Sequence, residues 1–265
     1  MMNKKTMTLA NSTMAFIEEG KGQPIVLLHG FCGSAAYWEK TVPELSKQYR
    51  VIVPDLPGHG ASSADNLPQT IEGMAENVKL LLDELEIENA VIFGHSLGGY
   101  VALAFAEKNS DRLSGFSLVH STAFPDAEEA KKGRDATIEK VKNHGVHVLI
   151  DVLVPRLFAK EKLITNAKDV ENAKDIGYTT SPEGVIAGLQ AMKTRPDRNH
   201  VLENTHLPVL LVAGEGDQVI SPERTFSAAG PTITHSLIKK AGHISMLEEP
   251  DELIREMLSF LKKVQ

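Results

Sequence analysis

The stretch Val91-Ile92-Phe93-Gly94-His95-Ser96-Leu97-Gly98-Gly99-Tyr100 changes character at a single serine. The apolar run before Gly94 indicates a buried strand, and the Ala-rich run after Tyr100 favours a helix. Between them stands the pattern G-x-S-x-G, which is typical of a nucleophile elbow, a sharp turn that projects a serine hydroxyl from a strand end. Glycines fit there because a Cβ would collide with the neighbouring elements. The turn also places the Leu97 N–H at a helix N-terminus, where it can face a developing oxyanion.

The rest of the chain repeats this alternation of apolar strands and amphipathic helices. Strands are predicted at 25–28, 49–53, 115–119, 207–213 and 232–238, and helices at 36–45, 69–85 and 250–262. Two shorter strands, 6–10 and 13–18, flank Asn11-Ser12, a hairpin signal. Strands that are apolar throughout and alternate with helices predict a mostly parallel sheet covered on both faces.

Composition narrows the class of protein. The chain has 265 residues, of which 42% are hydrophobic and 24% charged, enough for one α/β domain with a large core. The net charge of −7 comes without a basic block, which argues against nucleic acid or an anionic membrane as a partner. Cys32 is the only cysteine, so no intramolecular disulfide can form. No signal peptide or membrane-spanning apolar run is evident, and a cytoplasmic protein is expected.

The rhythm changes between residues 121 and 206. Charge-rich helical segments, expected at 128–142 and 147–158 and after the N-cap Ser181-Pro182, replace the alternation of strands and helices. We interpret this part as a helical insertion into one domain, whose core comprises residues 1–120 and 207–265.

Three polar residues follow predicted strands, at the sheet edge where open α/β sheets place their sites. They are Ser96, Asp217 and His243. A serine hydroxyl becomes a good nucleophile only when a base takes its proton, and a histidine base needs a carboxylate to fix its tautomer. The chain order Ser, Asp, His is the one expected for this architecture.

Five short motifs in this order resemble the α/β-hydrolase superfamily over nearly the whole chain. They are His29-Gly30-Phe31 before Gly33-Ser34, Asp55-Leu56-Pro57-Gly58-His59-Gly60, Gly94-His95-Ser96-Leu97-Gly98-Gly99, Gly214-Glu215-Gly216-Asp217 and Gly242-His243. The resemblance implies an α/β-hydrolase fold, a mostly parallel eight-stranded sheet flanked by helices, with 121–206 as a helical cap after the sixth strand. It implies His243 as the base, Asp217 as the acid, and the N–H groups of Phe31 and Leu97 as the oxyanion hole. No cofactor and no metal are expected.

Other histidines are weaker candidates for the base. His95 is next to the serine, but neighbouring residues of an elbow point apart, so local packing or hydrogen bonding is expected. His29 and His59 lie in loops that resemble structural parts of the family. His144 and His147 could form a metal pair, but no carboxylate or cysteine completes it at zinc-like spacing, which favours a surface role.

The acid and the nucleophile also have alternatives. Glu215 lies two residues from Asp217, and Asp126 follows the sixth predicted strand. Cys32 has neither an elbow nor a paired base, so a packing role is expected. Ser34 is expected to cap the helix that follows it.

The predicted function is that of a serine hydrolase that cleaves a carboxylic ester or a similar small-molecule acyl substrate through an acyl-enzyme on Ser96. Serine at the elbow differs from the aspartate of the family's epoxide hydrolases and haloalkane dehalogenases. A lactonase, a carbon–carbon bond hydrolase and a slow-turnover ligand receptor remain alternatives, as do a monomer and a homodimer. Arg156, Arg195 and Arg198 could bind a substrate carboxylate, although solvent-facing arginines are the commoner outcome.

Overall fold

The structure, a computed structural model, describes residues 3–9 and 12–264. Its strands form one eight-stranded sheet in the order β1-β2-β4-β3-β5-β6-β7-β8. Their bounds are β1 (Lys4–Leu9), β2 (Ser12–Glu19), β3 (Pro24–Leu28), β4 (Arg50–Pro54), β5 (Ala90–His95), β6 (Leu113–Val119), β7 (Val209–Gly214) and β8 (Ile233–Ile238). The pairs β1–β2 and β2–β4 are antiparallel and the other pairs are parallel, which confirms the predicted sheet. Ala10, the last residue of the predicted strand 6–10, and Asn11 of the predicted hairpin turn lie outside the described residues.

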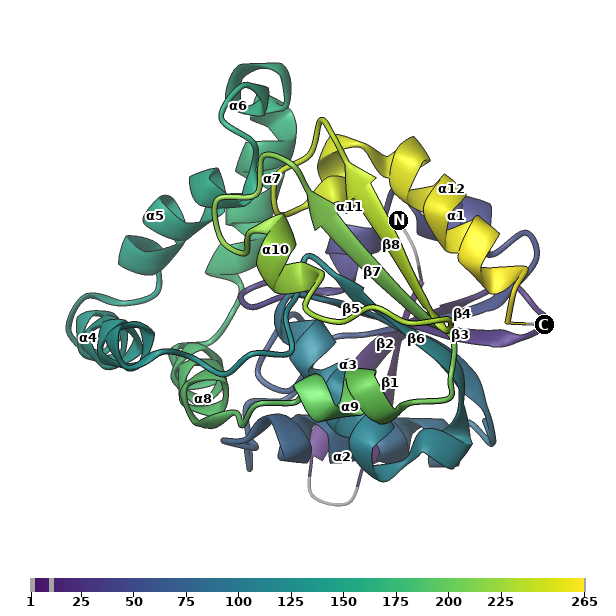
Figure 1. Cartoon of the computed structure of the whole chain (residues 1–265). Helices are drawn as coiled ribbons and strands as arrows, with labels where there is room; N and C mark the ends of the chain where they lie inside the picture. Colours follow the sequence, from purple (N-terminus) through teal and green to yellow (C-terminus); the bar gives the residue numbers. More distant parts are fainter. Residues whose placement is uncertain (1–2, 10–11, 265) are drawn as a thin grey trace.

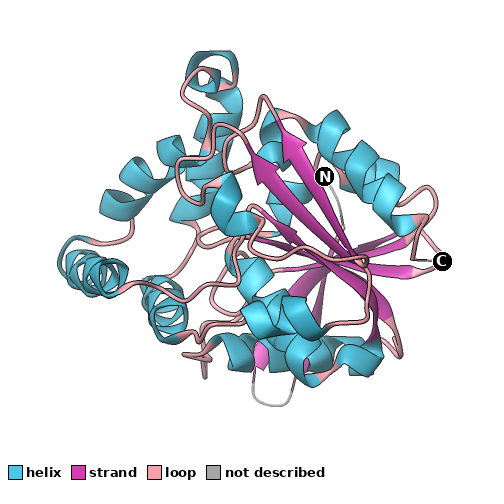
Figure 2. Ribbon diagram, in the orientation of Figure 1, coloured by secondary structure: helices cyan, strands magenta, loops and turns pink. Residues whose placement is uncertain are grey.

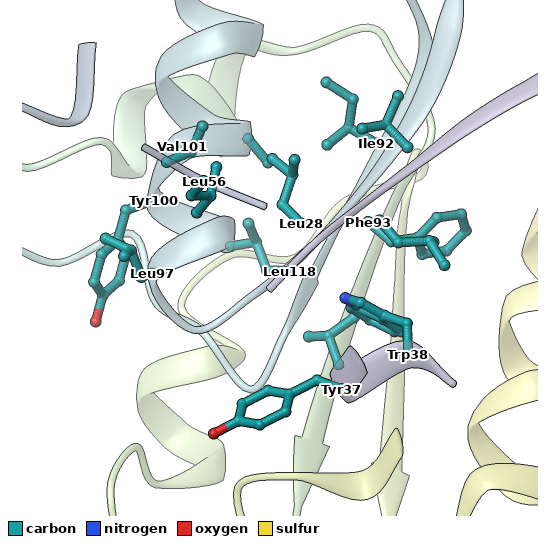
Figure 3. Close-up of a cluster of buried hydrophobic side chains, with 14 of the residues drawn as sticks. Leu28, Tyr37, Trp38, Leu56, Ile92, Phe93, Leu97, Tyr100, Val101 and Leu118 are labelled. Atoms are coloured by element: carbon teal, nitrogen blue, oxygen red, sulfur yellow. The ribbon is translucent and has the colours of Figure 1, made fainter. Parts of the chain in front are cut away.

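The centre of the sheet is apolar on both faces. In β5, Ile92 pairs with Val26 of β3 and with Phe116 of β6, and all three side chains are fully buried. Phe93 and Trp38 of the 3₁₀-helix η1 (Ala35–Trp38) are fully buried too and belong to the same apolar core (Figure 3). Burial of this kind stabilises the sheet by about 1.5–3 kcal/mol for each large side chain, and it fixes the strand end that carries Ser96.

Helices cover both faces of the sheet (Figures 1 and 2). One face carries α2 (Ile71–Glu84), α3 (Leu97–Lys108) and α9 (Asn199–Asn204), and the other carries α1 (Val42–Leu45) and α12 (Pro250–Leu261). Three further short helices belong to the core: η2 (Ser110–Arg112), α10 (Pro222–Thr225) and α11 (Ser245–Glu248). None of the helices in the described residues is long and apolar enough to cross a membrane.

The predicted helix 36–45 is wrong in detail, because it is split into η1 and α1. Ser34 does cap η1, since its Oγ accepts from the N–H of Ala36 at 3.2 Å. Pro43 has no N–H to continue a helix from η1, and it is found instead in the first turn of α1, where no N–H is needed.

Between β6 and α9 the chain forms a group of helices on the side of the molecule opposite the C-terminus (Figure 1). They are α4 (Glu128–His144), α5 (His147–Leu157), α6 (Lys162–Thr165), α7 (Ala167–Tyr178) and α8 (Pro182–Thr194). The predicted helices are observed, and Ser181 caps α8 by accepting from the N–H of Gly184 at 3.0 Å. Helix α8 approaches the core so closely that a Cβ on Gly184 would lie 2.1 Å from the carbonyl oxygen of Gly58.

Candidate active site

Ser96 stands at the tight turn between β5 and α3. Its φ of 50° and ψ of −112° are rare for a residue with a side chain, and such strain is typical of functional turns. A Cβ on Gly94 would lie 2.2 Å from the carbonyl oxygen of Gly98, and one on Gly98 would lie 2.6 Å from that of Leu28. Only glycine therefore fits at both positions, as the sequence predicts.

The structure brings Ser96, Asp217 and His243 together from three separate loops. The hydroxyl of Ser96 donates to Nε2 of His243 with 2.9 Å between the two atoms. Nδ1–H of His243 donates to Oδ2 of Asp217 at 2.8 Å, which fixes the tautomer of the imidazole. His243 is 1% exposed, so bulk water does not compete strongly for these bonds. This is the geometry that a general base and its orienting carboxylate require.

Asp217 is held as a carboxylate. Its Oδ1 accepts from the backbone N–H groups of Val219 at 2.7 Å and of Ile220 at 2.9 Å. Burial alone would raise the pKa of the Asp217 carboxyl. The positive charge of His243 and the hydrogen-bonding imidazoles of His243 and His120 have the larger, opposite effect, so this pKa lies far below its usual range. The Asp217 carboxylate therefore stays negative beside His243.

His120, which belongs to none of the five sequence motifs, is a second imidazole beside Asp217. Its Nε2 accepts from the hydroxyl of Ser245 at 2.7 Å and faces the backbone N–H of the same residue at 3.4 Å, so Nδ1 carries the proton. That Nδ1 lies 3.6 Å from Oδ2 of Asp217, beyond a normal hydrogen bond. Burial lowers the pKa of His120, which keeps it neutral. Its only sequence signal is its position at the end of β6.

His95 supports the loop that carries the candidate base. Because a carbonyl can only accept, Nε2–H of His95 donates to the backbone oxygen of His243, at 2.8 Å. Burial and the nearby imidazoles of His243 and His120 lower the pKa of His95 well below its usual range. His95 packs and hydrogen-bonds as expected, but its hydrogen-bond partner lies 148 positions away in the sequence.

A cavity of about 100 Å³ opens onto Ser96 and His243. Its wall is mostly apolar, with side chains from the loop after β3, from α5 and α8, and from the loop after β7: Phe31, Leu153, Leu157, Met192 and Val219. His95, Tyr100 and Arg134 complete the lining. The cavity therefore suits a small ligand with an apolar part, next to the hydroxyl of Ser96.

The two predicted oxyanion donors belong to segments that border Ser96. Leu97 begins α3, where the first N–H groups of a helix lack intrahelical partners. Phe31 follows Gly30, at which a Cβ would lie 3.2 Å from the Cβ of Ser96. Gly30 thus lets the loop of Phe31 come close to the serine.

The other candidate residues are engaged elsewhere. His29 Nε2 accepts from the N–H of Leu56 at 2.8 Å, and burial lowers the pKa of His29 to about 3. Cys32 is buried, and burial raises the pKa of its thiol, so it is a packing residue. Glu215 is exposed. Asp126 pairs with Arg134 and Arg195.

The predicted surface role of His144 and His147 agrees with their exposure, and they lie on different helices. In the described part of the chain, no group of three or more His, Cys, Asp or Glu side chains could hold a metal ion.

The expectation of solvent-facing arginines holds for Arg156 and is wrong for the other two. Arg195 and Arg198 are 6% and 3% exposed. Arg198 pairs with Glu72 and, at 3.0 Å, with Glu107, so it joins α2 and α3 to the segment after α8. Long side chains can be buried when carboxylates pair with them, which local sequence does not reveal.

Known proteins resemble this chain over most of its length. The family described as the alpha/beta hydrolase fold matches residues 23–250. A thermophilic esterase from Thermogutta terrifontis, solved with malate bound, is 32% identical, with a TM-score of 0.93 and 99% coverage of both chains. The enol-lactonase from Burkholderia xenovorans LB400 is 26% identical, with a TM-score of 0.89 over 97% of this chain and all (100%) of that one.

A relative known by sequence is longer. The dihydrolipoyllysine-residue acetyltransferase component of the acetoin cleaving system of Pseudomonas putida is 30% identical over 250 residues, which cover 91% of this chain. The chain spans 64% of the length of that relative. With its eight-stranded sheet, its serine elbow and the match over residues 23–250, this chain belongs to the alpha/beta hydrolase fold family.

Proposed function

We propose that this chain is a serine hydrolase that cleaves a carboxylic ester or a similar acyl substrate through an acyl-enzyme on Ser96. The observation that carries the proposal is the hydrogen-bonded chain from Ser96 through His243 to Asp217, which ends at a small apolar cavity. The esterase and the enol-lactonase described above support a substrate with an activated acyl group.

In the first half of the reaction, Nε2 of His243 takes the hydroxyl proton while Oγ of Ser96 attacks the carbonyl carbon. The N–H groups of Leu97 and Phe31 donate to the oxyanion that forms. Loss of one such donor typically lowers the rate by a factor of about 10²–10³. Protonated His243 then gives its proton to the leaving alcohol. Water repeats the attack on the acyl-enzyme and releases the acid.

Residues 121–206 act, in this proposal, as a cap over the site. Three of its helices supply cavity-lining side chains: Arg134 from α4, Leu153 and Leu157 from α5, and Met192 from α8. A cap of this kind selects the acyl part by shape.

A lactone is the second candidate substrate, because one of the similar solved structures is an enol-lactonase. The same serine would open the ring, and the leaving alcohol would remain attached to the acyl part. A panel of methyl esters and lactones of matched acyl length, followed by product analysis and steady-state turnover, separates the two substrates. Negligible turnover with stoichiometric labelling would identify a ligand receptor.

The central test is labelling with a fluorophosphonate probe and mapping of the labelled peptide by mass spectrometry. The native chain should be labelled at Ser96, whereas Ser96→Ala should lose both labelling and ester hydrolysis and keep its melting temperature. Ser259→Ala, which removes an exposed serine on α12, is the matched control and should be labelled like the native chain. Labelling that persists in Ser96→Ala refutes the assignment.

A further inference from the structure

One charged side chain outside the Ser96–His243–Asp217 chain lines the cavity. Arg134 extends from α4 into the wall that Ser96 and His243 share, and its side chain remains 20% exposed. The other cap and loop side chains in this wall are apolar: Phe31, Leu153, Leu157, Met192 and Val219. An apolar ligand that covers this positive charge removes its hydration without replacing it, which weakens binding. An anionic ligand pairs with the charge and binds more tightly.

Arg134 is held in place by Asp126. Its Nε donates to Oδ2 of Asp126, and its Nη2 donates to Oδ1 at 3.2 Å. Nη1 has no hydrogen-bond partner among residues 3–9 and 12–264. Nε and Nη2 thus hold the guanidinium of Arg134 in a fixed orientation, and Nη1 keeps a free N–H donor. A binding group that is oriented in advance loses less entropy when it binds its ligand.

Asp126 does not neutralise this group, because it is shared. Nη1 of Arg195 lies 2.7 Å from Oδ1 of the same carboxylate. Arg195 also donates to the backbone oxygens of Phe124 and Met192, and its guanidinium lies 4.1 Å from the ring centroid of Tyr100, another residue of the cavity wall. Two guanidinium groups around one carboxylate leave a net charge of about +1 beside the cavity.

We infer that Arg134 binds a carboxylate on the substrate. The preferred substrates are then short esters or lactones whose acyl part carries a free carboxylate in addition to the ester or lactone group. The inference rests on the proposed function and adds the substrate class. Nη1–H would donate to the free carboxylate while Oγ of Ser96 attacks the ester carbonyl. The cavity volume of about 100 Å³ favours short acyl chains over long ones.

The test compares two methyl esters that differ in charge and hardly in shape. Monomethyl glutarate carries the free carboxylate, and methyl 5-amino-5-oxopentanoate carries a neutral amide in its place. The measured quantity is the ratio of kcat/KM for the acid to kcat/KM for the amide. The native chain should have a ratio above one. Arg134→Gln should lower it by about 10- to 100-fold, chiefly by raising KM for the acid, because one hydrogen bond between charged groups is lost.

Two further variants make the result specific. Arg134→Lys keeps the charge without the planar fork, and its ratio should lie between those of the native chain and Arg134→Gln. Arg156→Gln removes an exposed arginine on the neighbouring helix α5 and should keep the native ratio. Competitive inhibition by glutarate, compared with glutaramate, measures the same preference without turnover and should weaken in Arg134→Gln.

The outcomes separate this inference from the proposed function. If the esters are hydrolysed and Ser96 is labelled, but the native ratio is one or less or Arg134→Gln leaves it unchanged, the carboxylate site is refuted. If neither ester is hydrolysed and Ser96 is not labelled, the proposed function fails first. If Arg134→Gln does not fold, the Arg134→Lys ratio and the glutarate inhibition of the native chain decide the matter.

Discussion

The carboxylate of Glu248 accepts a hydrogen bond from the backbone N–H of Ala159, with 2.7 Å between the two atoms. Its other oxygen accepts from the N–H of Gly242 at 2.8 Å, and the N–H of His243 donates to the carbonyl of Leu157 at 2.7 Å. One buried side chain thus joins the end of α5 to the loop that carries the candidate base. The position of the imidazole depends on the segment 121–206 as well as on the sheet.

Replacing Glu248 by alanine should destabilise the protein, because two buried N–H groups lose their acceptor. We expect the free energy of unfolding to fall by about 2–4 kcal/mol and the melting temperature by roughly 5–15 °C. Calorimetry at pH 6 measures the change. Glu249→Gln is the matched control: it breaks a partly exposed pair with Lys162, worth at most about 1 kcal/mol. Equal losses in both variants would contradict the bridging role of Glu248.

Glu248 should also make stability depend on pH. Burial raises the pKa of its carboxyl, and the hydrogen bonds from the N–H groups of Ala159 and Gly242 lower it. Burial has the larger effect, so the pKa is about 7. Between about pH 4.5 and 7 the folded state therefore binds more protons than the unfolded state, so stability falls as pH rises through this window. Glu248→Gln does not titrate there. From pH 5 to pH 8 the native chain should lose about 2–3 kcal/mol relative to this variant in urea unfolding, and a constant difference would exclude the shift.

Local patterns predicted the sheet, and they predicted that Ser96, Asp217 and His243 lie together at its edge, as the structure has them. The G-x-S-x-G turn, the apolar strands and the glycine before His243 are properties of short segments, and the structure agrees with each. The predicted helix 36–45 failed because the position of Pro43 decided where the helix restarts. Glu248 was missed for a different reason: its partners Ala159 and Gly242 are local neighbours only in the folded chain.

The surroundings of Arg134 could not be predicted from local sequence either. Arg134 lies in a mostly polar segment that looks like a solvated helix face, and nothing near it in sequence marks it as part of a cavity wall. Its partner Asp126 is eight residues away, but Arg195, which shares that carboxylate, lies beyond four more helices. Charge balance at this place becomes visible only once α4 and α8 are packed together.

His120 should act as a positioning residue for Asp217. We expect His120→Asn to lower kcat by about tenfold with little change in KM, because the carboxylate loses the second imidazole that borders it. Asparagine is chosen because His120 has a φ of 49°, which asparagine tolerates. Steady-state kinetics and the rate of fluorophosphonate labelling should fall together. The exposed His144→Asn is the control, and a rise in KM with native kcat would point to a merely structural role.

The contact between Gly184 of α8 and Gly58 of the core gives a test of how tightly the helices between β6 and β7 are packed. A Cβ on Gly184 would meet the carbonyl oxygen of Gly58 at 2.1 Å, and Gly58 has a φ of +75°, so this backbone has little room to move.

Gly133 is the matched control, because it lies inside α4, where a new Cβ meets nothing within 4 Å. Both changes to alanine gain helix propensity, so their difference isolates the contact. Gly133→Ala should raise the free energy of unfolding by about 0.5–1 kcal/mol. Gly184→Ala should lower it by about 1–3 kcal/mol, and should lower kcat/KM as well because α8 carries Met192 into the cavity wall. Equal stability of the two variants in urea unfolding would mean that α8 does not rest on the Gly58 loop in solution.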